Sequence, residues 1–344
     1  MKKLYLATIT VLALLTAGAQ DMHYTQFYNT PLTTNPALTG VVPGSYRVGA
    51  IYRNQWFSGV NNGFFNSPYQ TPSISFDMPI ALGTGGKDVV GVGAYVLYDA
   101  AGASSFQTFS LVASGSYIRH LSPNHQLSIG LQLGYTQTGY KNPQFASQYQ
   151  GNEFNQNIAS GINLQPNVKY ANLNVGLLYY GKLTSKIALY LGGTIFNTAV
   201  PKYNLATTTE KKTLYLRGNI SGGMDFTLGR RFHLLPSVLW MKQSVANQLN
   251  AGLGFGYDIN MRTNITLGIY SRSNDIITKD HQAESAIAYA AFQIKGFKVG
   301  ASYDFTVNKF KEAGPGTGAF EISLMYIGFP KAYSLKETLF CPRF

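Results

Sequence analysis

The chain has little of what usually identifies a soluble exported domain or a helical membrane protein. It contains 1 Cys in 344 residues, so it cannot form an internal disulfide. Charged residues make up only 12% of it, against about 25% in a typical soluble domain. After residue 19, no stretch approaches the roughly 18 continuous apolar residues that a transmembrane helix needs. These shortages disfavour a disulfide-rich secreted domain and exclude a helical membrane protein.

Groups that carry chemistry are scarce as well. Carboxylates are few, and no pair of them shares one strand face at i, i+2, as acid–base catalysis or a calcium site would favour. His120 and His125 flank one turn, but two His without Cys or nearby carboxylates make a poor metal site. The sequence therefore gives no reason to expect an enzyme, and we expect no metal and no cofactor.

The first residues have the features of an export signal. Lys2 and Lys3 provide a positive start, residues 4–15 are apolar, and Ala-Gly-Ala at 17–19 suits a signal peptidase. We expect residues 1–19 to be a signal peptide and Gln20 to begin the mature chain. A lipoprotein would need Cys at the cleavage point, whereas the single Cys is Cys341.

The abundant residues favour a membrane β-barrel. The chain has 36 Gly, 24 Tyr and 21 Phe. A mean hydropathy of −0.04 is expected where lipid-facing and water-facing residues alternate. The net charge of +12 could suggest nucleic-acid binding. Because the basic residues are dispersed and the protein is exported, we expect no nucleic-acid partner.

Alternation with a period of two dominates the chain after about residue 44. Between 126 and 135, Leu, Ile, Leu, Leu and Tyr occupy one face, and Gln, Ser, Gly, Gln and Gly the other. The same division recurs at 249–258 and 297–306. It predicts fourteen strands, at 44–58, 70–79, 88–99, 105–120, 124–140, 168–181, 185–197, 213–229, 231–242, 245–257, 262–272, 283–294, 296–307 and 318–329.

The connections alternate in length. Those after even-numbered strands are mostly short, and those after odd-numbered strands are mostly long, as at 59–69 and 141–167. Outer-membrane barrels have short periplasmic turns and long extracellular loops. We therefore predict an all-β, up-and-down antiparallel barrel over 44–329, with a segment at 20–43 that is periplasmic or lumenal, a periplasmic tail at 330–344, and both termini periplasmic.

Several charged residues fall on the inward-facing side of the predicted strands. Arg47 and Arg53 share the parity of inward Gly49, where an ion pair inside the barrel is favoured over contact with a partner. We predict a lumenal charge network, with Asp258 and Lys298 as further inward positions. Its candidate members are Arg47, Arg53, Arg217, Asp225, Arg262, Asp304 and Glu321.

Three local patterns resemble one protein family. They are the mature N-terminus QDMHYTQFY at 20–28 with PLTTNPALTG at 31–40, the first strand YRVGAIYRNQW at 46–56, and the CPRF end at 341–344. Together they resemble the PorP/SprF family of the Bacteroidetes type IX secretion system. The resemblance covers the layout of the mature chain, but its specific motifs occupy only the N-terminal region and the tail.

The resemblance implies an outer-membrane barrel, without catalysis, that is accessory to type IX secretion. Such a barrel would bind and anchor, or help export, a large secreted surface adhesin that carries a type B C-terminal domain, in gliding motility or adhesion. The implied partners are that adhesin, the secretion or motility machinery, and outer-membrane lipids including lipopolysaccharide. The Asn- and Gln-rich 141–167 loop suits such a contact.

Alternatives remain at both levels. Gln26, Asn35, Pro36 and Ala37 are candidates for a plug or a partner-binding segment, but Asn35-Pro36-Ala37 could equally form a simple turn, since Pro restricts both itself and Asn35. The alternative function is a channel or hydrophobic-solute transporter. Fourteen strands preceded by Asn-Pro-Ala also resemble the fatty-acid transporter family. A purely structural barrel is a third reading.

Overall fold

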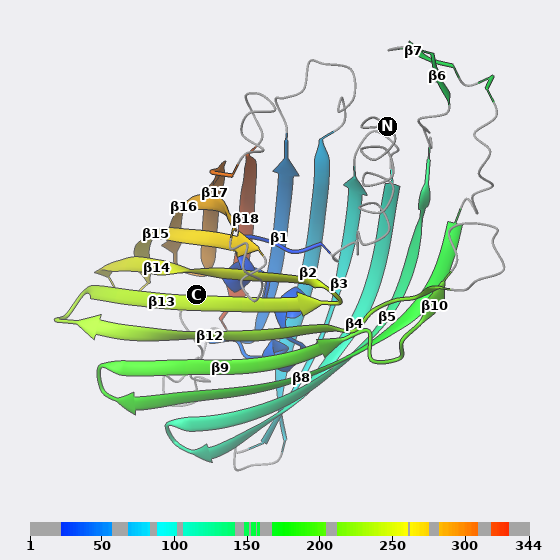
Figure 1. Cartoon of the computed structure of the whole chain (residues 1–344). Helices are drawn as coiled ribbons and strands as arrows, with labels where there is room; N and C mark the ends of the chain where they lie inside the picture. The colour runs from blue at the N-terminus through cyan, green and yellow to red at the C-terminus, as the bar shows by residue number, and fades with distance from the viewer. Residues whose placement is uncertain are drawn as a thin grey trace.

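The protein is a closed antiparallel β-barrel around an internal N-terminal segment (Figure 1). The computed structural model describes residues 22–56, 68–82, 88–101, 106–141, 148–150, 153–155, 157–158, 167–203, 212–260, 262–274, 282–308 and 318–329. The predicted signal peptide, tail and Cys341 lie outside these residues, as does most of the 141–167 loop.

Each barrel strand pairs with the next barrel strand along the chain, and the last pairs with the first. All fourteen predicted strands are present, so the predicted fold class is confirmed. The barrel strands are β1 (Tyr46–Gln55), β2 (Tyr69–Leu82), β3 (Asp88–Ala101), β4 (Phe106–Ser122), β5 (His125–Tyr140), β8 (Asn167–Thr184), β9 (Ile187–Phe196), β12 (Arg217–Leu228), β13 (Phe232–Gln243), β14 (Ala246–Asn260), β15 (Thr263–Asn274), β16 (Gln282–Ile294), β17 (Phe297–Thr306) and β18 (Ala319–Gly328).

Two further hairpins lie outside the barrel wall. β6 (Tyr149–Gln150) pairs with β7 (Glu153–Phe154), and β10 (Lys202–Tyr203) pairs with β11 (Lys212–Thr213). The second hairpin explains why β12 begins four residues later than the predicted strand at 213–229. Lys212 and Thr213 are extended as expected, but they pair with β10 and not with a barrel strand.

The alternation seen in the sequence is the alternation between the two faces of the wall. On β5, Leu131 and Leu133 are 55% and 64% exposed on the outside, whereas Gln132 between them is 1% exposed. An outer surface of exposed Leu, Ile and Phe is favourable only in contact with hydrocarbon. Closure between Tyr46–Gln55 and Ala319–Gly328 then gives the edge strands their hydrogen-bond partners, as a lipid environment requires.

The two ends of the barrel differ in their connections. At one end, here called the short-turn end, the strands are joined by 83–87, 123–124, 185–186, 229–231, 261–262 and 295–296. At the other end, the loop end, most connections are longer, such as 141–166 and 307–318, although 102–105 and 244–245 are also short. The predicted asymmetry of the connections is therefore present.

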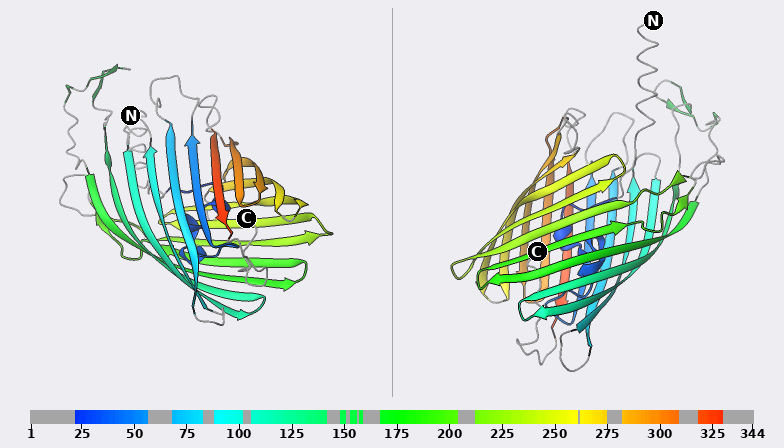
Figure 2. Two further views of the ribbon diagram at one scale, coloured as in Figure 1. Left: turned by 180° about the vertical axis from the view of Figure 1, so that it is seen from behind. Right: turned by 60° about the horizontal axis from the view of Figure 1, so that its bottom comes forward.

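Residues 22–45, here called the plug, lie inside the barrel. Figure 2 shows this blue segment among the strands from two further directions. It contains three short helices, η2 (Phe27–Asn29), α2 (Pro31–Thr34) and η3 (Pro36–Leu38), two of which begin with Pro. Proline suits this position because the first helical residue needs no N–H donor. In the part of the chain that the structure describes, no helix is long and apolar enough to cross a membrane.

The plug contributes to three apolar clusters between itself and the wall. Phe27 and Tyr28 pack against Leu239, Tyr270 and Tyr289 on one side of the barrel. Elsewhere, the plug inserts Ala37, Leu38 and Val41 in one cluster and Tyr24 and Leu32 in another. The core of this protein is thus the interface between plug and barrel.

Candidate functional site

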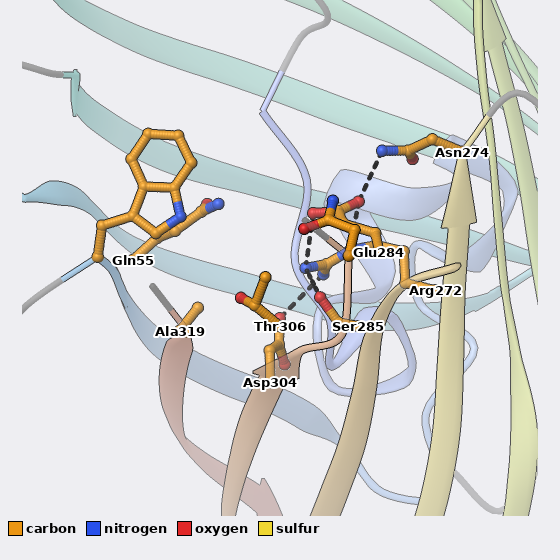
Figure 3. Close-up of a pocket in the computed structure, with 11 residues that line it drawn as sticks. Gln55, Arg272, Asn274, Glu284, Ser285, Asp304, Thr306 and Ala319 are labelled. Atoms are coloured by element: carbon orange, nitrogen blue, oxygen red, sulfur yellow. Dashed lines mark hydrogen bonds and ion pairs between the residues drawn. The ribbon is translucent and has the colours of Figure 1, made fainter. Parts of the chain in front are cut away.

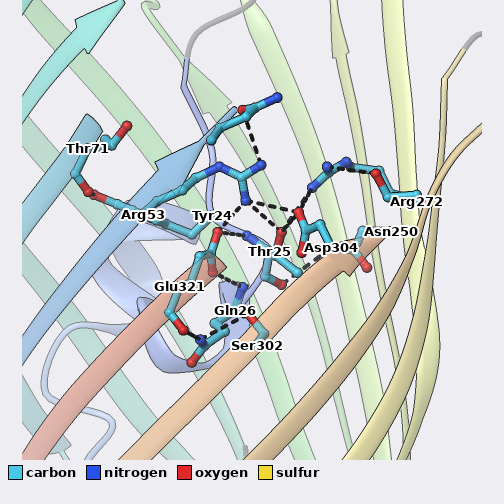
Figure 4. Close-up of polar contacts among 12 residues, drawn as sticks. Tyr24, Thr25, Gln26, Arg53, Thr71, Asn250, Arg272, Ser302, Asp304 and Glu321 are labelled. Carbon is cyan, nitrogen blue, oxygen red and sulfur yellow. Dashed lines mark hydrogen bonds and ion pairs between the residues drawn. The ribbon is translucent and has the colours of Figure 1, made fainter. Parts of the chain in front are cut away.

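The start of the plug is bound by one carboxylate on the last strand (Figure 4). The backbone N–H groups of Thr25 and Gln26 donate to the two oxygens of Glu321, at 2.7 and 2.9 Å. The Gln26 side-chain amide donates to the Glu321 carbonyl at 3.0 Å and to the Ser302 hydroxyl at 3.1 Å. Glu321 is fully buried, so its charge is stabilised by these donors and by a cation.

That cation is Arg53, which faces Glu321 across the seam where the barrel closes. Arg53 also contacts Asp304 at 3.2 Å, and Asp304 in turn pairs with Arg272 at 2.9 Å. Arg272 pairs further with Glu284 at 3.1 Å. These five residues, Arg53, Arg272, Glu284, Asp304 and Glu321, are called the charge cluster.

The Thr25 hydroxyl joins the plug to both halves of the charge cluster. It donates to Asp304 at 2.8 Å and lies 2.8 and 2.9 Å from the guanidinium nitrogens of Arg53 and Arg272. Buried ion pairs are stable only when their remaining hydrogen-bonding groups are satisfied. Thr25 helps to meet this condition, so the cluster and the plug stabilise each other.

The Asn35-Pro36-Ala37 motif forms a turn pressed against the opposite wall. The Asn35 side chain accepts from the Ala37 N–H at 2.8 Å and donates to the Leu177 carbonyl at 3.0 Å. Ser128 donates to the Ala37 carbonyl at 2.8 Å. The motif is therefore a turn that attaches the plug to the wall, and partner binding by these residues stays a prediction.

Two glycines of the wall allow this close approach. A Cβ atom added to Gly130 would overlap the backbone of Pro36, and one added to Gly176 would overlap the Asn35 side chain. A glycine on a strand often marks a close backbone approach. Gly130 on β5 and Gly176 on β8 have this role here.

The end of the plug is fixed by a second ion pair, near the short-turn end. Arg47 and Asp77 form two parallel hydrogen bonds, at 2.9 and 2.8 Å, and both are buried. Asp77 also accepts from the Gly40 N–H at 2.7 Å, and Arg47 donates to the carbonyls of Leu38 and Val41. Gly40 has a φ of +71°, which favours glycine.

The charged residues predicted for the lumen therefore fall into several places. Arg53, Asp304 and Glu321 meet in the charge cluster, and Arg47 lies in the second ion pair. Arg217 donates to the Met22 carbonyl at 3.4 Å, and its guanidinium lies 4.1 Å from the centre of the Phe196 ring.

Two of the predicted members lie away from the plug. Asp225 contacts His233, which also contacts Asp258, near the short-turn end. Arg262 is not lumenal. It is an exposed residue of the turn between β14 and β15, because β15 begins only at Thr263 and the inward parity of the strand does not extend to it.

Sequence reasoning missed Asp77, Arg272 and Glu284. The alternation could have identified Asp77 and Arg272. Ile74 and Phe76 face outward on β2, so Asp77 faces inward. Ile269 faces outward on β15, so Arg272, three residues later, faces inward. A β-bulge between Arg272 and Ser273 shifts the pairing with β16, so the position of Glu284 did not follow from parity.

A pocket lined mostly by polar residues lies at the loop end, and Arg272, Glu284 and Asp304 of the charge cluster form part of its wall (Figure 3). Its volume is about 250 Å³, and its walls include Trp56, Arg272 and Glu284. Asp304, which accepts from the Thr25 hydroxyl, is one of its lining residues. This pocket, the mouth pocket, brings the residues that hold the start of the plug close to the loop end.

The described chain begins and ends at opposite ends of the barrel. Met22 contacts Arg217, the first residue of β12, at the loop end. Phe329 follows β18 at the short-turn end. The termini themselves lie outside the described residues, so their predicted periplasmic location remains a prediction.

Comparison with solved structures shows the same fold in other barrels. The monoaromatic hydrocarbon channel CymD is 13% identical with a TM-score of 0.52, and the match covers 88% of this chain and 93% of that one. A Pseudomonas aeruginosa FadL homologue is 13% identical with a TM-score of 0.50, covering 85% and 92%. The Pseudomonas putida toluene transporter TodX is 11% identical with a TM-score of 0.50, covering 90% and 94%. At these identities the likeness concerns the fold alone.

Comparison of sequences identifies the family. No curated protein matches the chain. The family described as "Type IX secretion system membrane protein PorP/SprF" matches residues 16–326, which include the plug and nearly the whole barrel. This family and this fold are those of a secretion-associated outer-membrane barrel and of no known enzyme class. The chain belongs to the PorP/SprF family of type IX secretion system membrane proteins.

Proposed function

We propose that this barrel is an accessory of type IX secretion that binds a large secreted surface adhesin through its type B C-terminal domain, and so anchors the adhesin or assists its export. Membership of the PorP/SprF family supports the association with secretion. The adhesin, and the binding of lipopolysaccharide and other outer-membrane lipids, are parts of the proposal. The short turns would face the periplasm and the loop end the cell surface.

The observation that carries this proposal is the occupied lumen. The plug is bonded to strands on all sides, from Glu321 on β18 to Ser128 on β5 and Leu177 on β8. Two cavities where it meets the wall measure about 10 and 20 Å³, which is room for about one water each. A barrel filled in this way is better suited to docking a protein at its end than to passing one beside the plug.

The mouth pocket gives the loop end a recessed polar surface for such docking. It combines an aromatic side chain, Trp56, with charged and amide groups including Glu284 and Asn274. Aromatic and adaptable polar side chains are common at sites that bind other proteins. A segment of the adhesin that enters the pocket would contact Arg272 and Glu284 next to the start of the plug.

The proposal is tested by surface display in a strain that lacks the barrel. A reporter fused to a type B C-terminal domain is expected to reach the surface in the parent strain and to be lost or released in the deletion strain. Wild-type barrel should restore display, and a variant without residues 143–166 should restore less. A reporter whose sorting domain is not of type B is the matched control and should be unaffected. Normal display in the deletion strain would refute the proposal.

The same strains separate this function from the alternative of a hydrophobic-solute channel. Purified barrel in a planar bilayer is expected to show little conductance, because the plug fills the lumen. Steady conductance, or uptake of an apolar solute that depends on the barrel, combined with unaffected reporter display would favour the channel.

A further inference from the structure

The short-turn end has exposed charge of one sign along a continuous part of its rim. Four consecutive short turns, those joining β8 to β9, β12 to β13, β14 to β15 and β16 to β17, each carry at least one exposed cation. Together these cations are called the basic arc, and they are Lys186, Arg230, Arg231, Arg262 and Lys295. The plug, the charge cluster and the mouth pocket use none of them.

Among the residues that the structure describes, no Asp or Glu forms an ion pair with the basic arc, and the nearby Asp225 contacts His233. The four turns, with the two residues on either side of each, contain no Asp or Glu. Asp258 lies just beyond this range, but its carboxylate contacts His233. The only other described short turn, at 123–124, differs, because the nearby cation Arg119 pairs with Asp88. The arc is thus a local excess of positive charge on one part of the rim.

Outward apolar residues adjoin the same turns and show where the hydrocarbon ends. Leu228 and Phe232, 54% and 59% exposed, flank the Arg230-Arg231 turn. Ile294 and Phe297, 46% and 60% exposed, flank Lys295. Tyr257 and Tyr326 pack against the two Phe rings, as in the aromatic belt that lies at the level of lipid headgroups. The cations therefore lie within a residue or two of the membrane boundary.

We propose that the basic arc binds the phosphate groups of anionic phospholipids in the leaflet that meets the short-turn end. Guanidinium and ammonium groups bind phosphate through charge-assisted hydrogen bonds, and Arg does so with two parallel bonds. A protein that docked from the aqueous side would not need its contact residues to alternate with lipid-facing Leu, Ile and Phe. The arc would hold the barrel at a fixed depth and prefer anionic over zwitterionic lipid. This site is independent of the proposed secretion function.

The test compares lipid preference in purified mature protein. Wild-type barrel in a neutral maltoside detergent is offered equimolar phosphatidylglycerol and phosphatidylcholine, and bound lipids are counted by native mass spectrometry. The arc variant carries R230Q, R231Q, R262Q and K295Q. The control carries K141Q, K169Q, K202Q and K242Q, four exposed lysines at the loop end, and has the same net charge as the arc variant. Heat-dependent gel mobility verifies that each barrel is folded.

We expect wild type and control to bind more phosphatidylglycerol than phosphatidylcholine. In the arc variant, the ratio of the two bound lipids should fall roughly fivefold for each charge removed. Equal loss in the control would assign the effect to total charge and overturn the proposal. A wild-type barrel without preference would also overturn it, and would make an acidic protein the better candidate for the arc. The preference for phosphatidylglycerol should persist with 20 mM inorganic phosphate as a competitor. A site for free phosphate would be saturated by the competitor, and the lipid preference would then be lost.

Discussion

Replacing Glu321 by Gln should detach the start of the plug. The carboxylate accepts from two backbone N–H groups of the plug and from Arg53, and it is fully buried. The amide of Gln has the same shape but turns an N–H₂ group toward one of these donors. Arg53 keeps its ion pair with Asp304 at 3.2 Å, so the cost, about 1–3 kcal/mol, comes from the buried donor that then faces the N–H₂ group. We expect Glu321→Gln to lose a free energy of unfolding of this size.

The assay combines stability with conductance. Urea unfolding of the refolded barrel measures the loss of stability, and planar-bilayer recording detects opening of the lumen when the plug is released. Glu284→Gln is the matched control, because Glu284 likewise pairs with an Arg of the charge cluster, Arg272. The Glu284 side chain is 21% exposed, however, and its described hydrogen bonds include no contact with the plug. Its loss should be about 1 kcal/mol or less. Equal stability of the two variants, with no conductance in either, would refute the reasoning.

Four further predictions follow from the plug contacts. Gly176→Ala should cost about 1–3 kcal/mol by overpacking against Asn35, whereas Gly193→Ala, whose added Cβ meets nothing within 4 Å, should be neutral in the same urea assay. Arg47→Met should destabilise the barrel by about 3–5 kcal/mol because it leaves Asp77 buried without its cation. As a control, Arg119→Met removes the exposed ion pair between Arg119 and Asp88 and should change the stability little. If the loop end faces outward, Met22→Cys in a Cys341→Ser background should react with a membrane-impermeant maleimide on intact cells. Protection on intact cells with reaction after lysis would show that the loop end faces the periplasm. Burial raises the pKa of Tyr28 well above 10.0. The contribution of Tyr28 to the free energy of unfolding is therefore complete below about pH 10 and is lost at higher pH, where this side chain ionises in the unfolded chain. The urea midpoint should fall above about pH 10, and it should fall less in Tyr28→Phe.

The fold followed from the sequence because every strand carries its own signal. Leu131 and Leu133 face lipid and Gln132 faces the lumen whatever the neighbouring strand is, so alternation locates the strand and its inner face. Turn lengths then gave the order and the two ends. The hairpin at Lys202–Tyr203 and Lys212–Thr213 was missed because two-residue strands are too short to show a period.

The site followed only in part, because parity gives the face of a residue and not its partner. Arg53 and Glu321 are both inward by parity, but they are 268 residues apart and meet only because the last strand closes on the first in that register. Thr25 had no periodic signal at all, and its place beside Asp304 and Arg272 depends on the path of the plug. Interactions between a plug and a wall arise from tertiary structure, and a single sequence does not contain a local pattern for them.

Attachment of the plug to the wall is the central claim, and one engineered disulfide tests it most directly. The hydroxyls of Thr39 in the plug and Ser114 on β4 lie 2.6 Å apart, so the Thr39→Cys, Ser114→Cys pair in a Cys341→Ser background has its sulfur atoms close to bonding distance. The account predicts near-complete crosslinking in native membranes under mild oxidation, seen as a mobility shift without reductant, while Thr39→Cys with Ser302→Cys, beside Gln26, stays reduced. Free thiols at both positions of the first pair, or equal crosslinking of the two pairs, would contradict it.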